Sequence, residues 1–256
     1  MRAFGRSVLI VSTLLGLAGM AAAAEVRVLA TRATEGALVA LAKEFAQESG
    51  HRAVFTIGSP AAVMAKIKAN EIYDVVVLAE PAIDQLDRQG LVNPESRVRL
   101  ANIGLGVAVR EGAPAPDIAT ADAFKQALTN AKSIVYGEVF PNTSGERIEK
   151  MLAGMGMLDT LKPKLKIVPG HANSQALIAK GEIELGLYNM SEIPDGKGVK
   201  YVGPVPAPFQ SSATFEAARM SEGSAVEASE AFIRYIGGAE GRPVWAKAGF
   251  VPLADH

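Results

Sequence analysis

The chain has 256 residues, with 26 Lys and Arg, 27 Asp and Glu, three His, no Cys and a formal net charge of −1 at pH 7. The lack of cysteine excludes thiol catalysis, disulfides and cysteine metal sites, and the balanced charge argues against nucleic acid or an anionic membrane surface as partner. With 49% hydrophobic residues, the chain can bury one large core or two smaller ones.

The first residues have the pattern of a secretory signal peptide. Arg2 and Arg6 precede an apolar stretch over residues 7–20, and residues 21–24 form an alanine cleavage pattern. A membrane-spanning helix needs about 20 consecutive apolar residues, and this stretch is shorter. We therefore expect residues 1–24 to be cleaved off after Ala24 and the mature protein to reside in the periplasm, not embedded in the membrane.

The mature chain begins with an alternating series of predicted strands and helices. Strands are predicted at 26–30, 53–57 and 75–79, and helices at 35–49, 61–69 and 81–89. The run at 75–79 is continuously apolar, which is typical of a strand buried on both faces of a parallel sheet. The series predicts an α/β unit with right-handed crossovers.

A second alternating series follows. It has predicted strands at 105–109, 133–137, 166–168 and 183–188, and predicted helices at 122–130, 145–155 and 174–180. The turn-rich segment "PDGKGVKYVGPVPAPFQ" comes next, and helices are predicted at 224–236 and 240–248. Two α/β units in a chain of this length predict two lobes.

Small polar residues follow the predicted strands of both series. Ligands of open α/β sheets bind outside the carboxyl ends of the strands, so these residues are candidate site residues. They include Thr31, Arg32, Ser59, Glu80, Thr143, Ser144, His171, Asn173, Tyr188, Asn189 and Glu192. Each Ser, Thr or Asn alone is more typical of a helix N-cap, but their recurrence at one sheet edge favours an anion site built on helix N-termini.

Arg32 differs from its neighbours because capping does not need a guanidinium group. It suits a carboxylate or a tetrahedral oxyanion. A salt bridge to Glu35 explains it equally well, and the sequence leaves both interpretations open.

Most enzyme motifs are missing. There is no G-x-S-x-G elbow, no P-loop and no H-E-x-x-H, and "GLGVAV" at 104–109 enters a strand instead of opening a helix. His171 is a lone histidine in a loop, which is more often structural than catalytic. We expect neither a metal nor a cofactor.

The sequence resembles one family over the whole mature chain. The residues that carry the resemblance are "VRVLATRATEGALVALAKEFAQESG", "FTIGSPAAVMAKIKANEIYDVVVLAE", "LDRQGLV", "NTSGERIEKMLAGMGMLDTLKPKLKIVPG", "IAKGEIELGLYNMSEI" and "YVGPVPAPFQ". They are similar to the periplasmic substrate-binding proteins of ABC importers with the two-lobed type II fold, and most closely to the molybdate-binding-protein-like branch.

The resemblance implies a ligand cleft between two lobes, formed by residues 25–105 with 204–256 and by residues 106–203. It implies a monomer that closes around a small anion and is recognised by a membrane permease. By position, the ligand contacts would be Thr31, Arg32, Ser59, Thr143, Ser144, Asn173, Tyr188 and Asn189.

Two departures from the branch concern the ligand. Molybdate binders typically place a serine after the first strand and paired serines after the second, where this chain has Thr31-Arg32 and Ser59-Pro60. A buried arginine would suit an organic anion whose carboxylate it holds bidentately. The ligand is therefore either an oxyanion such as molybdate or an organic carboxylate.

An enzyme on the same scaffold is the alternative, because fold does not fix function. Periplasmic aconitate isomerases resemble this branch, and such a reaction moves an allylic proton in a tricarboxylate, which needs anion anchors and a base. Glu80, Tyr188, Glu192 and His171 are the candidate proton-transfer residues. We favour binding over catalysis because spacing alone identifies no acid–base pair.

Overall fold

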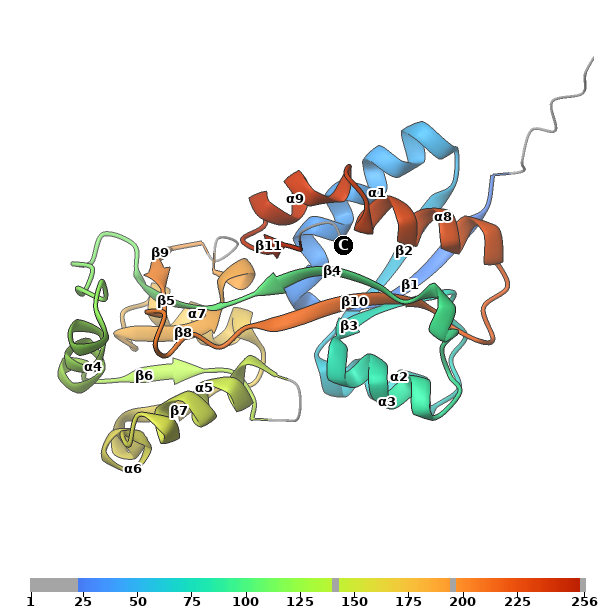
Figure 1. The fold of residues 1–256 in the computed structure, drawn as a ribbon. Helices are drawn as coiled ribbons and strands as arrows, with labels where there is room; N and C mark the ends of the chain where they lie inside the picture. The colour runs from blue at the N-terminus through green and yellow to red at the C-terminus, as the bar shows by residue number, and fades with distance from the viewer. Residues whose placement is uncertain (1–22, 140–142, 194–196, 254–256) are drawn as a thin grey trace, which may run out of the picture.

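The computed structural model describes residues 23–139, 143–193 and 197–253. Apart from Ala23 and Ala24, the predicted signal peptide lies outside them. Within the described residues the strands form two mixed sheets, at opposite ends of an elongated molecule (Figure 1). The six-stranded sheet has the order β11-β4-β10-β3-β1-β2, and the five-stranded sheet has the order β7-β6-β8-β5-β9.

The first sheet contains β1 (Glu25–Thr31), β2 (Arg52–Gly58), β3 (Val75–Ala79), β4 (Val98–Ile103), β10 (Ala213–Arg219) and β11 (Val251–Pro252). The second contains β5 (Leu105–Arg110), β6 (Ile134–Tyr136), β7 (Leu165–Ile167), β8 (Leu185–Asn189) and β9 (Val199–Pro204). The α-helices are α1 (Glu35–Ser49), α2 (Pro60–Lys68), α3 (Glu80–Arg88), α4 (Ala121–Asn130), α5 (Ser144–Gly154), α6 (Leu158–Leu161), α7 (His171–Ala179), α8 (Val226–Gly237) and α9 (Gly241–Lys247). Short 3-10 turns are η1 (Arg32–Thr34), η2 (Pro94–Ser96), η3 (Lys162–Lys164) and η4 (Met190–Glu192).

Helices cover both faces of the first sheet, so its central strands are apolar throughout. All five residues of β3 are buried. Val75 and Val77 pack with α1, α8 and α9, whereas Val76 and Leu78 pack with α2 and α3, because successive side chains of a strand point to opposite faces. Figure 1 shows these two groups of helices on either side of the sheet.

The second sheet is built on the same principle. Val107 and Tyr136 face a core shared with α4 and α5, and Ala108 and Val135 face the opposite side, where Ile178 of α7 lies. No helix among the described residues is long and apolar enough to cross a membrane.

The predicted α/β class and each predicted strand and helix are confirmed, with element ends shifted by three residues at most. Strands β4, β9, β10 and β11 were not predicted from the sequence, and β9 lies in the segment described there as turn-rich. The sequence of β10, "ATFEAAR", has no strand pattern of its own. It forms a strand because it pairs antiparallel with β3 on one side and β4 on the other.

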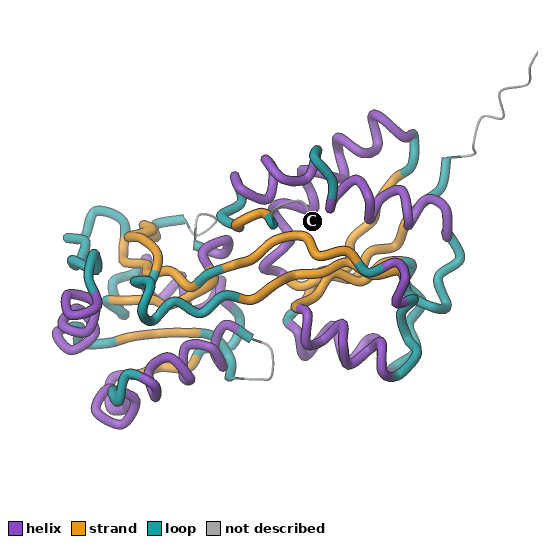
Figure 2. The backbone as a smooth tube through the Cα atoms, viewed as in Figure 1, coloured by secondary structure: helices purple, strands orange, loops and turns teal. Residues whose placement is uncertain are grey.

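The chain passes between the two sheets twice (Figure 2). The first crossing is residues 103–105, where β4 ends and β5 begins, and the second crossing is residues 205–212, between β9 and β10. Gln210 joins them, because its side chain accepts the Leu105 N–H at 2.6 Å and donates to the Leu105 carbonyl at 2.9 Å. Gly104 permits this close approach, since a Cβ there would lie 3.0 Å from the Gln210 amide.

Candidate functional site

A cavity of about 260 Å³ is lined by residues from both sheets. Nine of the residues singled out from the sequence line it: Thr31, Arg32, Ser59, Thr143, Ser144, His171, Tyr188, Asn189 and Glu192. They follow strands or begin helices of both sheets, so the carboxyl-edge argument locates one shared pocket.

Two of the singled-out residues do not line this cavity. The Asn173 side chain is exposed and donates to the Pro169 carbonyl at 3.0 Å. Glu80 forms an ion pair with Arg99 of β4. The side chains of Asn173 and Glu80 therefore make these bonds outside the cavity.

Helices α2, α5 and α7 begin at the cavity wall. Ser59 caps α2 by accepting the Ala62 N–H at 3.2 Å, Thr143 caps α5 by accepting the Glu146 N–H at 3.2 Å, and α7 begins at His171. The first N–H groups of a helix lack intrahelical partners and carry the positive end of the helix dipole. Their arrangement around one cavity favours an anion.

The start of α5 is fixed by its contact with the loop after β6. The Thr143 hydroxyl donates to the Glu138 carbonyl at 2.9 Å, and a Cβ on Gly145 would lie 2.1 Å from that same oxygen. Only glycine fits at position 145. The Thr143 hydroxyl therefore donates its proton to the Glu138 carbonyl and holds the start of α5 in the cavity wall.

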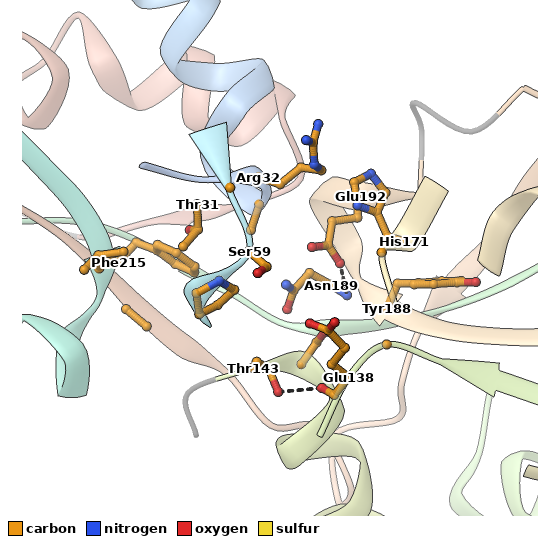
Figure 3. A pocket seen from close by; sticks show the side chains of 18 of the residues that line it. Thr31, Arg32, Ser59, Glu138, Thr143, His171, Tyr188, Asn189, Glu192 and Phe215 are labelled. Atoms are coloured by element: carbon orange, nitrogen blue, oxygen red, sulfur yellow. Dashed lines mark hydrogen bonds between the residues drawn. The ribbon is translucent and has the colours of Figure 1, made fainter. Parts of the chain in front are cut away.

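Tyr188 lines the cavity, but its hydroxyl is bonded elsewhere. It is buried, its hydroxyl donates to Ser174 Oγ at 2.9 Å, and Figure 3 shows the ring turned away from the cavity. Burial raises the pKa of Tyr188 above its ordinary value, against the opposing hydrogen bond with Ser174. In contrast, Thr31 Oγ1 is buried at the cavity wall without a hydrogen-bond partner among the described residues. Such a group calls for a ligand or a water molecule.

The position of Arg32 is compatible with both interpretations of the sequence. It lines the cavity and also forms a salt bridge to Glu35, with 2.9 Å between Nη1 and Oε2. Its side chain is 46% exposed, and Figure 3 shows it extending away from Ser59 at the rim. Glu35 occupies only one of its five N–H donors.

Two carboxylates also face the cavity. Figure 3 shows Glu138 and Glu192 turned toward the same space as the Asn189 amide and the Ser59 hydroxyl. Glu192 accepts the Asn189 backbone N–H at 3.2 Å. Burial raises the pKa of Glu192, while hydrogen bonds from Asn189 and the charges of Arg147 and Arg32 oppose that rise. Among the described residues, no group of three or more His, Cys, Asp or Glu side chains could hold a metal ion.

Glu138, Phe215 and Arg147 were not among the residues singled out from the sequence. Glu138 comes two residues after β6 and could have been found by its place behind a strand. Phe215 lies on the missed strand β10. Arg147 is the fourth residue of α5 and donates to Asn189 Oδ1. Its sequence context is that of any charged helix residue, so no local signal could have found it.

Comparison with known proteins gives consistent matches. A family model described as "Bacterial extracellular solute-binding protein" matches residues 26–251. An aconitate isomerase from Pseudomonas sp is 32% identical over 196 residues, which are 76% of this chain and 73% of that protein. The molybdate-binding protein ModA of Escherichia coli (strain K12) is 25% identical over 239 residues, which are 91% of this chain and 92% of that protein.

The solved periplasmic molybdate-binding protein of Azotobacter vinelandii has a TM-score of 0.75 and 23% sequence identity, covering 90% of this chain and 100% of that one. This likeness confirms the predicted two-lobed fold. Together the matches confirm the predicted resemblance to molybdate-binding proteins and aconitate isomerase.

Proposed function

Since the chain belongs to the family of bacterial extracellular solute-binding proteins, we propose that it binds a small organic anion with two or three carboxylates in the cavity between its sheets. The observation that carries this proposal is the convergence of α2, α5 and α7, whose N-termini begin at the wall of one cavity. Helix N-termini from both sheets can hold an anion with backbone N–H groups and little formal charge.

The other groups in the cavity favour an organic acid over a tetrahedral oxyanion. Glu138 and Glu192 are acceptors, and they would repel an oxyanion that has no proton to donate. An organic acid can place its carboxylates at the helix N-termini and at Arg32, and place a hydroxyl or C–H group near the two glutamates.

The proposal includes the setting that the sequence predicted. Residues 1–24 would direct export, residues 25–105 with 204–256 and residues 106–203 would form the two lobes, and the monomer would deliver its ligand in the periplasm to an ABC permease. The family match and the two crossings between the sheets support this setting. Closure would follow from the ligand's higher affinity for the state in which both lobes contact it.

A thermal-shift panel on the mature chain tests the proposal. The panel contains molybdate, tungstate, sulfate, phosphate and a set of di- and tricarboxylates with both aconitate isomers. At 100 times Kd, a ligand that binds only the folded state should raise Tm by about 5–10 °C. A shift with tricarboxylates and none with metal oxyanions is expected. A shift confined to molybdate and tungstate would contradict the proposal and indicate that the chain binds metal oxyanions.

A second candidate function is isomerisation of the bound tricarboxylate. The observation that favours it is the half-buried Glu192 in the cavity wall, whose pKa burial raises above its ordinary value, as is common for carboxyl groups that transfer protons. In such a reaction a base takes a proton from the carbon next to one carboxylate and a proton returns at the other end of the allyl unit. The Pseudomonas aconitate isomerase is the relative that supports this candidate.

The test is to incubate the protein with one aconitate isomer and to follow the other by proton NMR. For an enzyme, Glu192→Gln should remove turnover and leave binding of the substrate within a few-fold of wild type. Glu80→Gln is the matched control, because Glu80 lies outside the cavity and pairs with Arg99. Bound but unconverted aconitate would rule out this candidate and leave the binding function standing.

A further inference from the structure

Arg147 joins three parts of the molecule. Its Nη1 donates to the Ile103 carbonyl at 3.2 Å and to the Ser211 carbonyl at 2.7 Å, and its Nη2 donates to Asn189 Oδ1. Ile103 lies in the first crossing, Ser211 in the second crossing and Asn189 in the cavity wall. One side chain therefore bonds both connections between the sheets and the candidate site.

The two crossings already form a unit through Gln210, which bonds to Leu105 of the first crossing and to the Val205 carbonyl at 3.1 Å in the second. Arg147 adds a link from this unit to α5. That helix is anchored in the second sheet, because Ile148 and Leu152 are buried in its core. A change in the angle between the sheets must change the bonds that Arg147 makes.

The bond to Asn189 also fixes which end of its amide faces the ligand. A guanidinium group has only donors, so the oxygen of the Asn189 amide must face Arg147. The amide nitrogen then lies on the cavity side, where one of its two N–H groups hydrogen-bonds Glu192 and the other remains for a ligand. Figure 3 shows the Asn189 side chain directed toward the space beside Ser59. Through Arg147, Asn189 becomes a donor to the ligand.

Arg147 is also a cation with neutral partners. All three of its hydrogen-bond acceptors are uncharged oxygens. Burial lowers the pKa of Arg147 to about 10, and the charge of Glu192 opposes this only in part. The residue stays charged at neutral pH, and its field behind Asn189 favours a negative charge in the cavity.

We propose that Arg147 is a positioning residue that holds Asn189 as a hydrogen-bond donor to the anion and ties this wall of the cavity to both crossings, so that occupancy of the cavity and the geometry of the crossings are coupled. This inference rests on the proposed function, and it names a residue that acts on ligand affinity and lobe closure without lining the cavity.

The first experiment is a double-mutant cycle with Arg147→Met and Asn189→Ala, read by calorimetric titration of trans-aconitate and, separately, molybdate. Arg147→Met should weaken binding of trans-aconitate at least 30-fold, and Asn189→Ala about 10-fold. The double variant should bind within about two-fold of Arg147→Met, because Arg147 acts through Asn189. Arg147→Lys keeps the charge and should restore part of the affinity.

The control is Arg97→Met, which removes a half-buried arginine whose side chain bonds only carboxylates. It should lower stability and leave the affinity for either probe unchanged. If the losses from Arg147→Met and Asn189→Ala multiply, or if Arg147→Met binds like wild type, the proposal is overturned.

Amide hydrogen exchange without ligand separates this inference from the proposed function. Arg147→Met should speed exchange at least 10-fold in the crossings and in residues 186–192, and leave α8 unchanged, whereas Arg97→Met should not affect the crossings. If wild type binds neither probe but exchange responds in this way, the proposed function fails and the coupling of wall to crossings stands. Unchanged exchange in the crossings overturns the coupling itself.

Discussion

Arg97 and Arg147 are half-buried arginines with opposite surroundings. Arg97 forms ion pairs with Asp84, Asp87 and Glu216 at 2.6–2.9 Å. Burial lowers its pKa, but the hydrogen bonds to Glu216, Asp84 and Asp87 outweigh burial and raise it above the ordinary value. Arg147 bonds three neutral oxygens, and its pKa falls to about 10.

The two regions differ in whether the chain supplies the counter-charge of the arginine. Around Arg97 the chain supplies its own counter-charges, and Glu216, only 2% exposed, also pairs with Arg99. The charged groups of that network therefore find their counter-charges within the chain and need no bound ion. Among the described residues Arg147 forms no ion pair, and the cavity beyond Asn189 is where an anion can supply a counter-charge. We expect changes at Arg97 to affect stability and changes near the cavity to affect binding.

The largest expected effect is on stability at the charge network. Arg97→Met should lower the free energy of unfolding by about 3 kcal/mol, because it leaves the buried Glu216 carboxylate with only Arg99 as partner. Urea denaturation measures the change. The exposed Arg110→Met at the end of β5 is the control and should stay within about 0.5 kcal/mol of wild type. Equal losses of unfolding free energy in Arg97→Met and Arg110→Met would show that the ion pairs of Arg97 contribute no special stability.

The next effect is on affinity at the rim of the cavity. Arg32→Ala should weaken a carboxylate ligand by more than about 1.5 kcal/mol, since it removes a charge-assisted hydrogen bond. Stability should hardly change, because the pair with Glu35 is exposed on both sides and such pairs contribute little. Titration of the tricarboxylate identified in the thermal-shift panel measures this. Unchanged affinity would leave Arg32 with only its salt bridge.

A helix N-cap contributes about 1 kcal/mol to the free energy of unfolding. Two such caps, one at the cavity and one away from it, allow effects on stability and on binding to be compared. Ser59 caps α2 at the cavity, and Thr120 caps α4 away from it, accepting the Ala123 N–H at 3.1 Å. Ser59→Ala and Thr120→Ala should each lower the free energy of unfolding by about 1 kcal/mol. Only Ser59→Ala should also weaken ligand binding. A loss of affinity in Thr120→Ala would show that destabilisation alone reduces binding.

The smallest expected effect is on the pH dependence of stability. The pKa of Glu192 is raised in the folded state above its ordinary value of 4.5, so the folded protein binds more protons than the unfolded chain between these two pKa values. Stability therefore falls as pH rises through that window. Glu192→Gln should make this fall shallower, as measured by urea denaturation from pH 4 to 8. Identical pH profiles for the two proteins would show that Glu192 titrates normally.

Much of the fold could be predicted because it depends on local patterns. The apolar run at 75–79 predicted a strand buried on both faces, which β3 is. The helix starts at Ser59 and Thr143 were visible as caps. β10 could not be predicted, because its alanine- and glutamate-containing sequence becomes a strand only through pairing with β3 and β4.

The candidate site was predictable in its location and less so in its chemistry. The carboxyl-edge argument selected nine residues that line the cavity, because it depends only on where strands end. It could not tell that the Tyr188 hydroxyl donates to Ser174 or that Glu80 pairs with Arg99. Those bonds depend on which side chains the packing brings within reach.

The sequence by itself determined the α/β class, the order of most elements and the helix starts that offer N–H groups, because each follows from periodicity or capping over a few residues. Only the tertiary structure decided that Glu138 faces Glu192 across one cavity and that Arg147 reaches both crossings. The acceptors of Arg147 lie 42, 44 and 64 residues away along the chain. Contacts at such separations are set by how the two sheets pack and where the chain crosses between them.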